Sequence, residues 1–169
     1  MKFAELFDDT SVRPFRFAVV LAVVLVTIML CQPAKSQEVN WTTSYQDAIE
    51  KAKKTDAPIL LYFTGSDWCP WCKKLSQEVF KAPEFAAWVD MRVVPTFVDF
   101  PKKSQLPANL SQQNNELLER YRPHLTGFPT ALFIKPDGTV IGKLGYEQGG
   151  VRHWIQKAQP IVAKQDKST

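Results

Sequence analysis

Two cysteines separated by two residues form the part of this sequence best suited to chemistry. They are Cys69 and Cys72, in the segment WCPWC. In an oxidising compartment, a pair so close in sequence tends to form a disulfide. That disulfide would close a very small loop, so it would constrain the unfolded chain little. Because such a bond adds little stability, we expect it to serve reversible thiol–disulfide exchange.

A buried strand and an amphipathic helix are predicted on either side of the cysteine pair. Residues 59–63 form a continuous apolar run, which is typical of a strand buried on both faces. Residues 65–67 are glycine and polar residues, which predict a loop. Apolar side chains then recur at helical spacing from Cys69 to about Phe80. The pair is therefore expected at a strand-to-helix junction.

The remaining pattern predicts the element order α-β-α-α-β-α-β-β-α. Pro95 is awkward within its predicted strand, because proline cannot donate to a ladder, so we expect a bulge, an edge strand or a late strand start. This order is typical of an α/β domain with a mixed sheet and helices on both faces. The other helices are expected at 45–55 after the N-cap Ser44, from Pro83 to 90, at 111–121 and at 151–162, and the other strands within 92–100, at 130–134 and at 140–144.

Residues 1–36 are interpreted as a signal peptide or membrane anchor. Residues 17–31 are apolar and uncharged and follow Arg13 and Arg16. A helix of this length would rise about 22 Å, short of the ~30 Å hydrocarbon core of a bilayer. The pattern favours a cleaved signal peptide, with the site after Ser36; an uncleaved anchor at 17–31 and lipidation of Cys31 are the alternatives. All three predict that the domain, residues 37–169, is exported to the periplasm.

The segment FTGSDWCPWCK resembles a subgroup of exported bacterial thioredoxin-like proteins in the thioredoxin superfamily. The segment from Gly127 to Thr130 begins a strand about sixty residues after the pair, where this family has a cis-proline beside its active-site sulfurs. LFIKPDGTVIG resembles the terminal hairpin of the family. The resemblance covers most of residues 39–160. It implies the thioredoxin fold, a central mixed β-sheet flanked by helices, and a cis bond between Phe128 and Pro129.

The position of the two cysteines on the expected helix suggests different roles for them. A thiolate, not a thiol, attacks a disulfide. Cys69 would lie at the helix N-terminus, where unpaired N–H groups and the helix dipole favour an anion and lower the thiol pKa. We therefore expect Cys69 to be the nucleophile. Cys72, one turn further on and more buried, would be the resolving thiol.

Five further residues are candidates for substrate binding. Trp68 and Trp71 can shield the site and offer an apolar surface, and Pro70 fits the first helical turn without losing a hydrogen bond. The resemblance implies that substrate backbone docks by strand addition beside Phe128 and Pro129. Phe128 is bulkier than is usual at its position, so it either narrows the substrate range or fills space.

One departure from the family pattern concerns proton transfer. Thioredoxins keep a buried acid on the strand before the cysteines, but residues 59–63 contain no carboxylate, and Tyr62 lies near the expected position. Asp67 is interpreted as polarity of an exposed loop. Water or Lys73 would then take the proton of the resolving cysteine.

The function predicted from these observations is an extracytoplasmic thiol–disulfide oxidoreductase. We expect a monomer that acts on protein thiols and disulfides together with a membrane or extracytoplasmic redox partner. The net charge of +4 is spread without a like-charge run, which disfavours nucleic acid as a partner. The direction of electron flow stays open, because Pro70-Trp71 matches neither the Gly-Pro of reductants nor the Pro-His of a strong oxidant.

Two other functions remain as alternatives, and no cofactor or metal is expected. A structural zinc site would need a second ligand pair, and His124 and His153 lack ligand spacing. Two thiolates could hold Cu(I), as in a metallochaperone. The chain could also be a non-catalytic thioredoxin-fold binding module whose disulfide is incidental.

Overall fold

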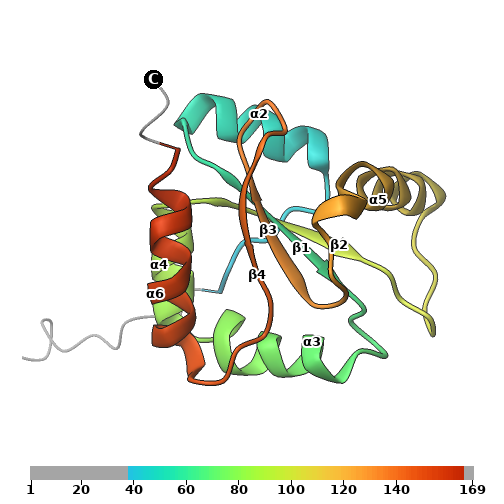
Figure 1. The fold of residues 1–169 in the computed structure, drawn as a ribbon. Helices are drawn as coiled ribbons and strands as arrows, with labels where there is room; N and C mark the ends of the chain where they lie inside the picture. Colours follow the sequence, from blue (N-terminus) through green and yellow to red (C-terminus); the bar gives the residue numbers. More distant parts are fainter. Residues whose placement is uncertain (1–37, 166–169) are drawn as a thin grey trace, which may run out of the picture. The chain divides into compact units, whose positions relative to one another are not determined.

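A computed structural model describes residues 38–165. The predicted signal peptide or anchor, with its apolar residues 17–31, lies outside the described residues. Within them, helices and strands follow one another in the order that the sequence predicts (Figure 1). In chain order they are α2 (Tyr45–Thr55), β1 (Ile59–Thr64), α3 (Pro70–Leu75), η1 (Ser76–Phe80), α4 (Pro83–Asp90), β2 (Val94–Asp99), α5 (Ala108–Tyr121), η2 (Arg122–His124), β3 (Thr130–Ile134), β4 (Val140–Leu144) and α6 (Gly150–Val162).

The four strands form one mixed sheet in the order β2-β1-β3-β4. β1 runs parallel to β2, whereas β1 with β3 and β3 with β4 are antiparallel. β1 is therefore a central strand, and all six of its residues are buried. This is the central mixed sheet flanked by helices that the sequence predicts, and it confirms the thioredoxin fold.

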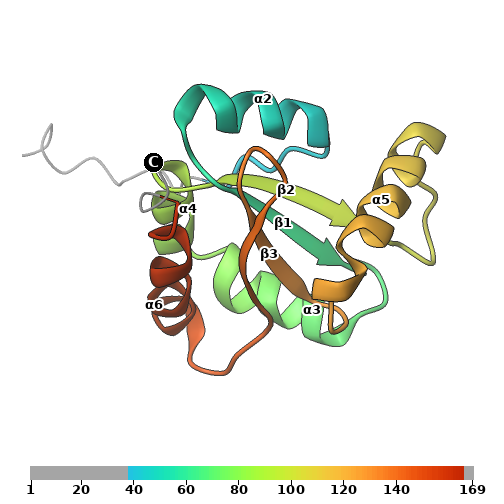
Figure 2. The same cartoon turned by 45° about the horizontal axis from the view of Figure 1, so that its top comes forward.

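Helices cover both faces of the sheet, and alternate residues of β1 point to opposite faces. Leu60 and Tyr62 pack with α3, η1, α4 and α6. Ile59, Leu61 and Phe63 pack with α2 and α5. Figures 1 and 2 show α2 and α5 apart from α3, α4 and α6, with the strands between the two groups. The hydrophobic core is therefore divided into two layers by the sheet.

Most predicted ends are close to the observed ends, and two details differ. Ser44 caps α2 as expected, accepting a hydrogen bond from the N–H of Asp47 at 3.1 Å. α5 begins at Ala108, one turn before the predicted 111. The helix after the cysteines changes from α to π over Ser76–Phe80, where the N–H of Lys81 donates to the carbonyl of Ser76. This wider turn lets Val79 and Phe80 both face the core.

Candidate active site

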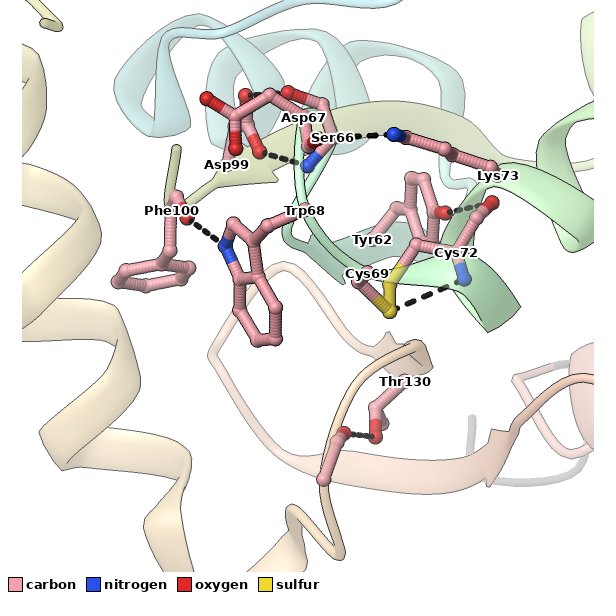
Figure 3. Close-up of a disulfide and its surroundings, with 11 residues drawn as sticks. Tyr62, Ser66, Asp67, Trp68, Cys69, Cys72, Lys73, Asp99, Phe100 and Thr130 are labelled. Atoms are coloured by element: carbon pink, nitrogen blue, oxygen red, sulfur yellow. Dashed lines mark hydrogen bonds between the residues drawn. A yellow bond between two sulfur atoms is a disulfide. The ribbon is translucent and has the colours of Figure 1, made fainter. Parts of the chain in front are cut away.

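The cysteine pair lies where β1 passes into α3, as the sequence predicts. Cys69 is the N-cap of α3, and Pro70 occupies the first turn of that helix. Cys69 and Cys72 form a disulfide (Figure 3). The backbone N–H of Cys72 donates to Cys69 Sγ at 3.1 Å. A free N–H at the start of the helix is therefore aimed at the sulfur of Cys69, where it would favour the thiolate once the disulfide is reduced.

The two cysteines differ in hydrogen bonding rather than in exposure. Cys69 is 3% exposed and Cys72 is 1% exposed, so the expected contrast between an open and a buried cysteine is small in the disulfide form. Cys69 Sγ accepts a helix N–H, whereas the carbonyl of Cys72 accepts the hydroxyl of Tyr62 at 3.1 Å. The chemical distinction therefore rests on the place of each cysteine in the first helical turn.

Tyr62 stands on β1 beneath the cysteine pair, near the position where the family resemblance implies an acid. Burial raises the pKa of Tyr62 to about 12. Its hydroxyl is therefore neutral at physiological pH and acts as a donor to Cys72. Tyr62 thus holds the helix backbone and does not replace the missing carboxylate as a base.

A small cavity adjoins the resolving cysteine. Its volume is about 200 Å³, and Tyr62, Cys72, Lys73 and Ser76 are among its lining residues. A polar cavity of this size has room for water. Lys73 directs its ammonium to the carbonyl of Asp67 at 2.9 Å, where it acts as a donor. The Lys73 ammonium is thus engaged as a hydrogen-bond donor, and the cavity provides space beside Cys72 for a water molecule.

Asp67 connects the cysteine loop to a loop 35 residues further along the chain. Its carboxylate accepts the backbone N–H groups of Lys102, Lys103 and Ser104, with shortest distances of 3.0, 2.6 and 3.3 Å. These N–H groups, that of Lys102 most, hold the pKa of Asp67 below its usual range. From the sequence alone, Asp67 is interpreted only as a polar loop residue. In the structure, its hydrogen bonds connect the segment before Cys69 to the segment after β2.

Trp68 is fixed by the same pair of loops. Its Nε1 donates to the carbonyl of Phe100 at 2.7 Å (Figure 3). Its ring lies 6.0 Å from the ring of Phe128. Phe100 and Phe128 are stacked, with centroids 5.3 Å apart. A side chain at Gly65 would overlap the Trp68 ring, so glycine is needed there. Trp68 is therefore a fixed wall beside Cys69.

The bond between Phe128 and Pro129 is cis, which confirms the prediction. Thr130 closes the preceding turn by donating its hydroxyl to the carbonyl of Gly127 at 2.6 Å. Phe128 and Pro129 line an open cavity of about 540 Å³ together with Trp71 and Tyr146. Phe128 packs against Phe100 and also faces this cavity, so it fills space; its effect on substrate range stays a prediction.

Trp71 is the most exposed aromatic side chain near the cysteines, at 56%. Its ring lies 5.4 Å from that of Tyr146, and the ammonium of Lys74 lies 5.6 Å from the Trp71 ring and 5.2 Å from the Tyr146 ring. The hydroxyl of Tyr146 donates to Glu78 at 2.8 Å. The structure thus brings Trp71 to the same cavity as Phe128 and Pro129.

Two residues of this site, Asp99 and Tyr146, could not be identified from the sequence around them. Asp99, only 9% exposed, accepts the N–H of Ser66 at 2.9 Å and the Ser66 hydroxyl at 2.6 Å. Tyr146 follows β4 and reaches the site only through the fold. His124 and His153 are not brought to the cysteines: the carbonyl of His124 accepts the Lys143 ammonium, and the His153 ring lies 3.2 Å from Glu147.

Two negative findings concern only residues 38–165. These residues contain no group of three or more histidine, cysteine or acidic side chains arranged to hold a metal ion. Over the same range, no helix has both the length and the apolar character that a membrane span requires.

Comparison with known proteins agrees with this geometry. A family model described as a thioredoxin-like domain matches residues 45–159. The chain belongs to the thioredoxin-like family. Within this family it is 35% identical over 131 residues to the disulfide bond reductase DsbH of Chlamydia pneumoniae, covering 78% of this chain and 77% of DsbH. It is 29% identical over 125 residues to the thioredoxin-related protein DsbJ of the same organism, covering 74% of this chain but 35% of DsbJ.

A solved structure of a thioredoxin-like relative gives the same result. The DsbH oxidoreductase superposes with a TM-score of 0.72 at 33% identity, covering 79% of this chain and 92% of the DsbH chain. Together with the Cys69–Cys72 disulfide, this homology makes the chain a thiol–disulfide oxidoreductase of the thioredoxin-like family.

Proposed function

We propose that the chain is an exported disulfide reductase that uses Cys69 and Cys72 to reduce disulfides of other proteins. The observation that carries this proposal is the cysteine pair at the start of α3, where the N–H of Cys72 donates to Cys69 Sγ. The direction is supported by the 35% identity to a protein named a disulfide bond reductase.

Cys69 is the nucleophile in this proposal, and Cys72 is the resolving thiol. The N–H of Cys72 stabilises the thiolate of Cys69, because a hydrogen bond to an anion is stronger than one to a neutral thiol. Cys72 lies one turn further on, within bonding distance of Cys69 Sγ in the disulfide. It becomes a thiolate by losing its proton to water in the adjoining cavity.

The exchange proceeds in two balanced steps. The Cys69 thiolate attacks one sulfur of the substrate disulfide, forming a mixed disulfide, and the other substrate sulfur leaves as a thiolate that takes a proton from water. The Cys72 thiolate then attacks Cys69 Sγ, which forms the internal disulfide and releases the second substrate thiolate. Two electrons pass to the substrate, so a protein dithiol must reduce the chain again before the next cycle.

The substrate would bind across the aromatic residues that surround the pair. Trp68, Pro70 and Trp71 supply the surface next to the sulfurs, while Phe128 and Pro129 supply a backbone edge for an extended peptide. The open cavity of about 540 Å³, lined by residues of both groups, supports this assignment. The bulk of Phe128 favours small side chains at the substrate position that it faces.

The location and the partners belong to the same proposal. Residues 1–36 would export the chain and residues 37–169 would work in the periplasm, with residues 17–31 as an anchor if they are not removed. The electron donor would be a membrane or extracytoplasmic dithiol protein, and the working form a monomer. N-terminal sequencing of the extracytoplasmic protein checks the first point; a full-length cytoplasmic product would contradict it.

Insulin reduction tests the activity and its direction. With dithiothreitol as the dithiol donor, we expect the chain to accelerate the precipitation of reduced insulin chains. The reverse reaction is measured with the oxidised chain and a reduced, unfolded protein that needs disulfides. If the oxidised chain introduces disulfides rapidly while the reduced chain leaves insulin intact, the chain is an oxidase and the proposal is wrong.

Serine variants test the two cysteine roles. Cys69→Ser should lose exchange entirely, whereas Cys72→Ser should still attack substrates and accumulate mixed disulfides. Alkylation of the reduced protein at mildly acidic pH should label Cys69 first. Trapping by Cys69→Ser instead of Cys72→Ser would reverse the assignment.

A further inference from the structure

Four lysines lie around the cysteine pair, although the sequence separates them into two pairs. Lys73 and Lys74 belong to α3, and Lys102 and Lys103 belong to the loop after β2. All four are exposed. We call these four residues the lysine rim. It places cations on both sides of the redox pair.

Each side of the lysine rim lies against an aromatic wall of the site. The ammonium of Lys102 stands 4.1 Å from the centre of the Trp68 ring. On the other side, the ammonium of Lys74 lies 5.6 Å from the Trp71 ring. Because Trp68 immediately precedes Cys69 and Trp71 lies between the two cysteines, a peptide that reaches Cys69 must pass close to these charges.

The position of Lys102 and Lys103 is built into the fold. Asp67 accepts their two backbone N–H groups, and the indole of Trp68 donates to Phe100 just before them. The residues that come directly before Cys69 therefore hold the second lysine pair in place. The backbone anchoring keeps the two lysines next to the segment that precedes Cys69.

The acidic groups that face this region are used by internal partners. The carboxylate of Asp67 is turned to the backbone N–H groups of the lysine loop. Glu78 accepts the hydroxyl of Tyr146 and lies 3.8 Å from Lys74. Asp99 is buried under Ser66. Between residues 38 and 165, neither Lys102 nor Lys103 forms an ion pair, so the rim keeps a positive excess toward solvent.

We propose that the lysine rim recognises acidic protein segments that contain the target disulfide. This inference rests on the proposed reductase function and names its substrate class: disulfides flanked by aspartate or glutamate. Complementary charge increases the rate at which a partner reaches the site and orients it on arrival. The aromatic walls then hold the apolar part of the segment beside Cys69.

Two synthetic peptides with the same disulfide test this proposal. One has glutamates next to the disulfide and the other has lysines at the same positions. The second-order rate constant for reduction by the reduced full chain is measured by stopped flow at about 0.01 M and about 1 M ionic strength, where the screening length falls from about 30 to about 3 Å. We expect the acidic peptide to react about tenfold faster at low salt and the ratio to approach one at high salt.

Paired variants identify the lysines responsible. Lys102→Gln with Lys103→Gln should reduce the acidic-to-basic rate ratio severalfold at low salt. The matched control, Lys51→Gln with Lys53→Gln on α2, removes the same charge from the other helix layer and should leave the ratio unchanged. Because the readout is a ratio, a general loss of activity does not affect it.

The outcomes separate this inference from the function on which it rests. Reduction of neutral 2-hydroxyethyl disulfide is measured in parallel. If the wild type reduces it but treats both peptides alike at low salt, the rim proposal is overturned and the reductase function stands. If the rim variant keeps the full ratio, the proposal is also overturned. If the neutral disulfide is not reduced at all, both proposals fail.

Discussion

The two faces of the sheet are packed by different chemistry, and only one of them packs against α3, the helix that carries Cys72. The face under α3, α4 and α6 is aromatic, with ring centroids between 4.7 and 6.4 Å apart. Its rings belong to Trp41, Tyr62, Phe80, Phe85, Phe97, Trp88, Phe133 and Trp154. The face under α2 and α5 is mainly aliphatic, built around residues such as Leu61, Leu117 and Leu132.

Each face contains one buried tyrosine, and the two tyrosines have different partners. On the aromatic face, Tyr62 donates to the carbonyl of Cys72. On the aliphatic face, Tyr121 lies 3.2 Å from the hydroxyl of Tyr45 and donates to the carbonyl of Gly138 in the hairpin turn. The aromatic face therefore helps to hold the redox helix in position, whereas the tyrosine of the aliphatic face is bound to the hairpin turn of the sheet.

The largest expected effect comes from removing one large side chain from each face. Trp154→Ala should lower the free energy of unfolding by about 3–5 kcal/mol and Leu117→Ala by about 2–5 kcal/mol. Only Trp154→Ala should also slow insulin reduction by the folded protein, because Trp154 Nε1 holds the carbonyl of Gly145, a wall of the substrate cavity. Urea unfolding and activity assays on the same samples measure both. If both variants reduced insulin equally slowly, the proposed link between the aromatic face and the active site would be wrong.

A smaller effect is expected from removing one hydroxyl on each face. Tyr62→Phe and Tyr121→Phe should each lose about 1 kcal/mol of stability. Only Tyr62→Phe should also speed the step in which Cys72 releases a mixed disulfide. If the contact breaks before the transition state, its removal destabilises only the starting state, and the rate should rise about fivefold. Quenched-flow measurement of mixed-disulfide decay checks this. An equal change in Tyr121→Phe would mean that the hydroxyl on Cys72 has no specific role.

Alkaline pH gives a related measurement on the same two tyrosines. Burial raises the pKa of Tyr62 to about 12 and also raises that of Tyr121. Since the folded chain prefers the neutral phenols, this stability is complete below the ordinary tyrosine pKa of about 10 and is lost as the pH rises toward 12. In each Phe variant, the free energy of unfolding, measured by urea titration, should therefore fall less between about pH 10 and about pH 12 than in the wild type. An unchanged slope in both variants would contradict this assignment.

The smallest effect separates two aspartates that accept loop N–H groups. Backbone N–H groups lower the pKa of Asp67, most through Lys102, and of Asp137, most through Thr139. Their stabilisation is therefore present above the ordinary aspartate pKa and is lost as the pH falls through the lowered value. Asp67→Asn and Asp137→Asn should each lower the melting temperature slightly at pH 7 and less at pH 2. Only Asp67→Asn should alter insulin reduction; an equal effect of Asp137→Asn would argue against the loop connection.

Much of the fold and the centre of the site could be predicted because their signals are local. Cys69 and Cys72 lie within a segment of four residues. Ser44 caps the helix that directly follows it, and the segment around Pro129 marks the start of a strand. Each of these features rests on backbone rules that act over a few residues. The element order was predicted from such local signals and is confirmed. The cis bond, also confirmed, was implied by the resemblance to the thioredoxin superfamily rather than by local backbone rules.

The rest could not be predicted because it depends on contacts between distant segments. Asp67 and Lys102 are 35 residues apart and meet only when two loops fold together. Tyr62 could be placed on β1, but its hydroxyl partner depends on where Cys72 lies above the sheet. The π-helical turn at Ser76–Phe80 follows from core packing, which the helical period alone does not contain.

Pro95, which the sequence left as a bulge, an edge or a late start, lies in the edge strand β2. The N–H of Val94 donates toward β1, to the carbonyl of Pro58, so the nitrogen of Pro95 faces outward, where a proline has no hydrogen to offer. Thr42 occupies the next outward positions, donating to the carbonyl of Pro95 and accepting the N–H of Phe97. An incoming strand from another molecule finds the middle of this edge occupied, which should hinder sheet-to-sheet aggregation through β2 when the domain is concentrated.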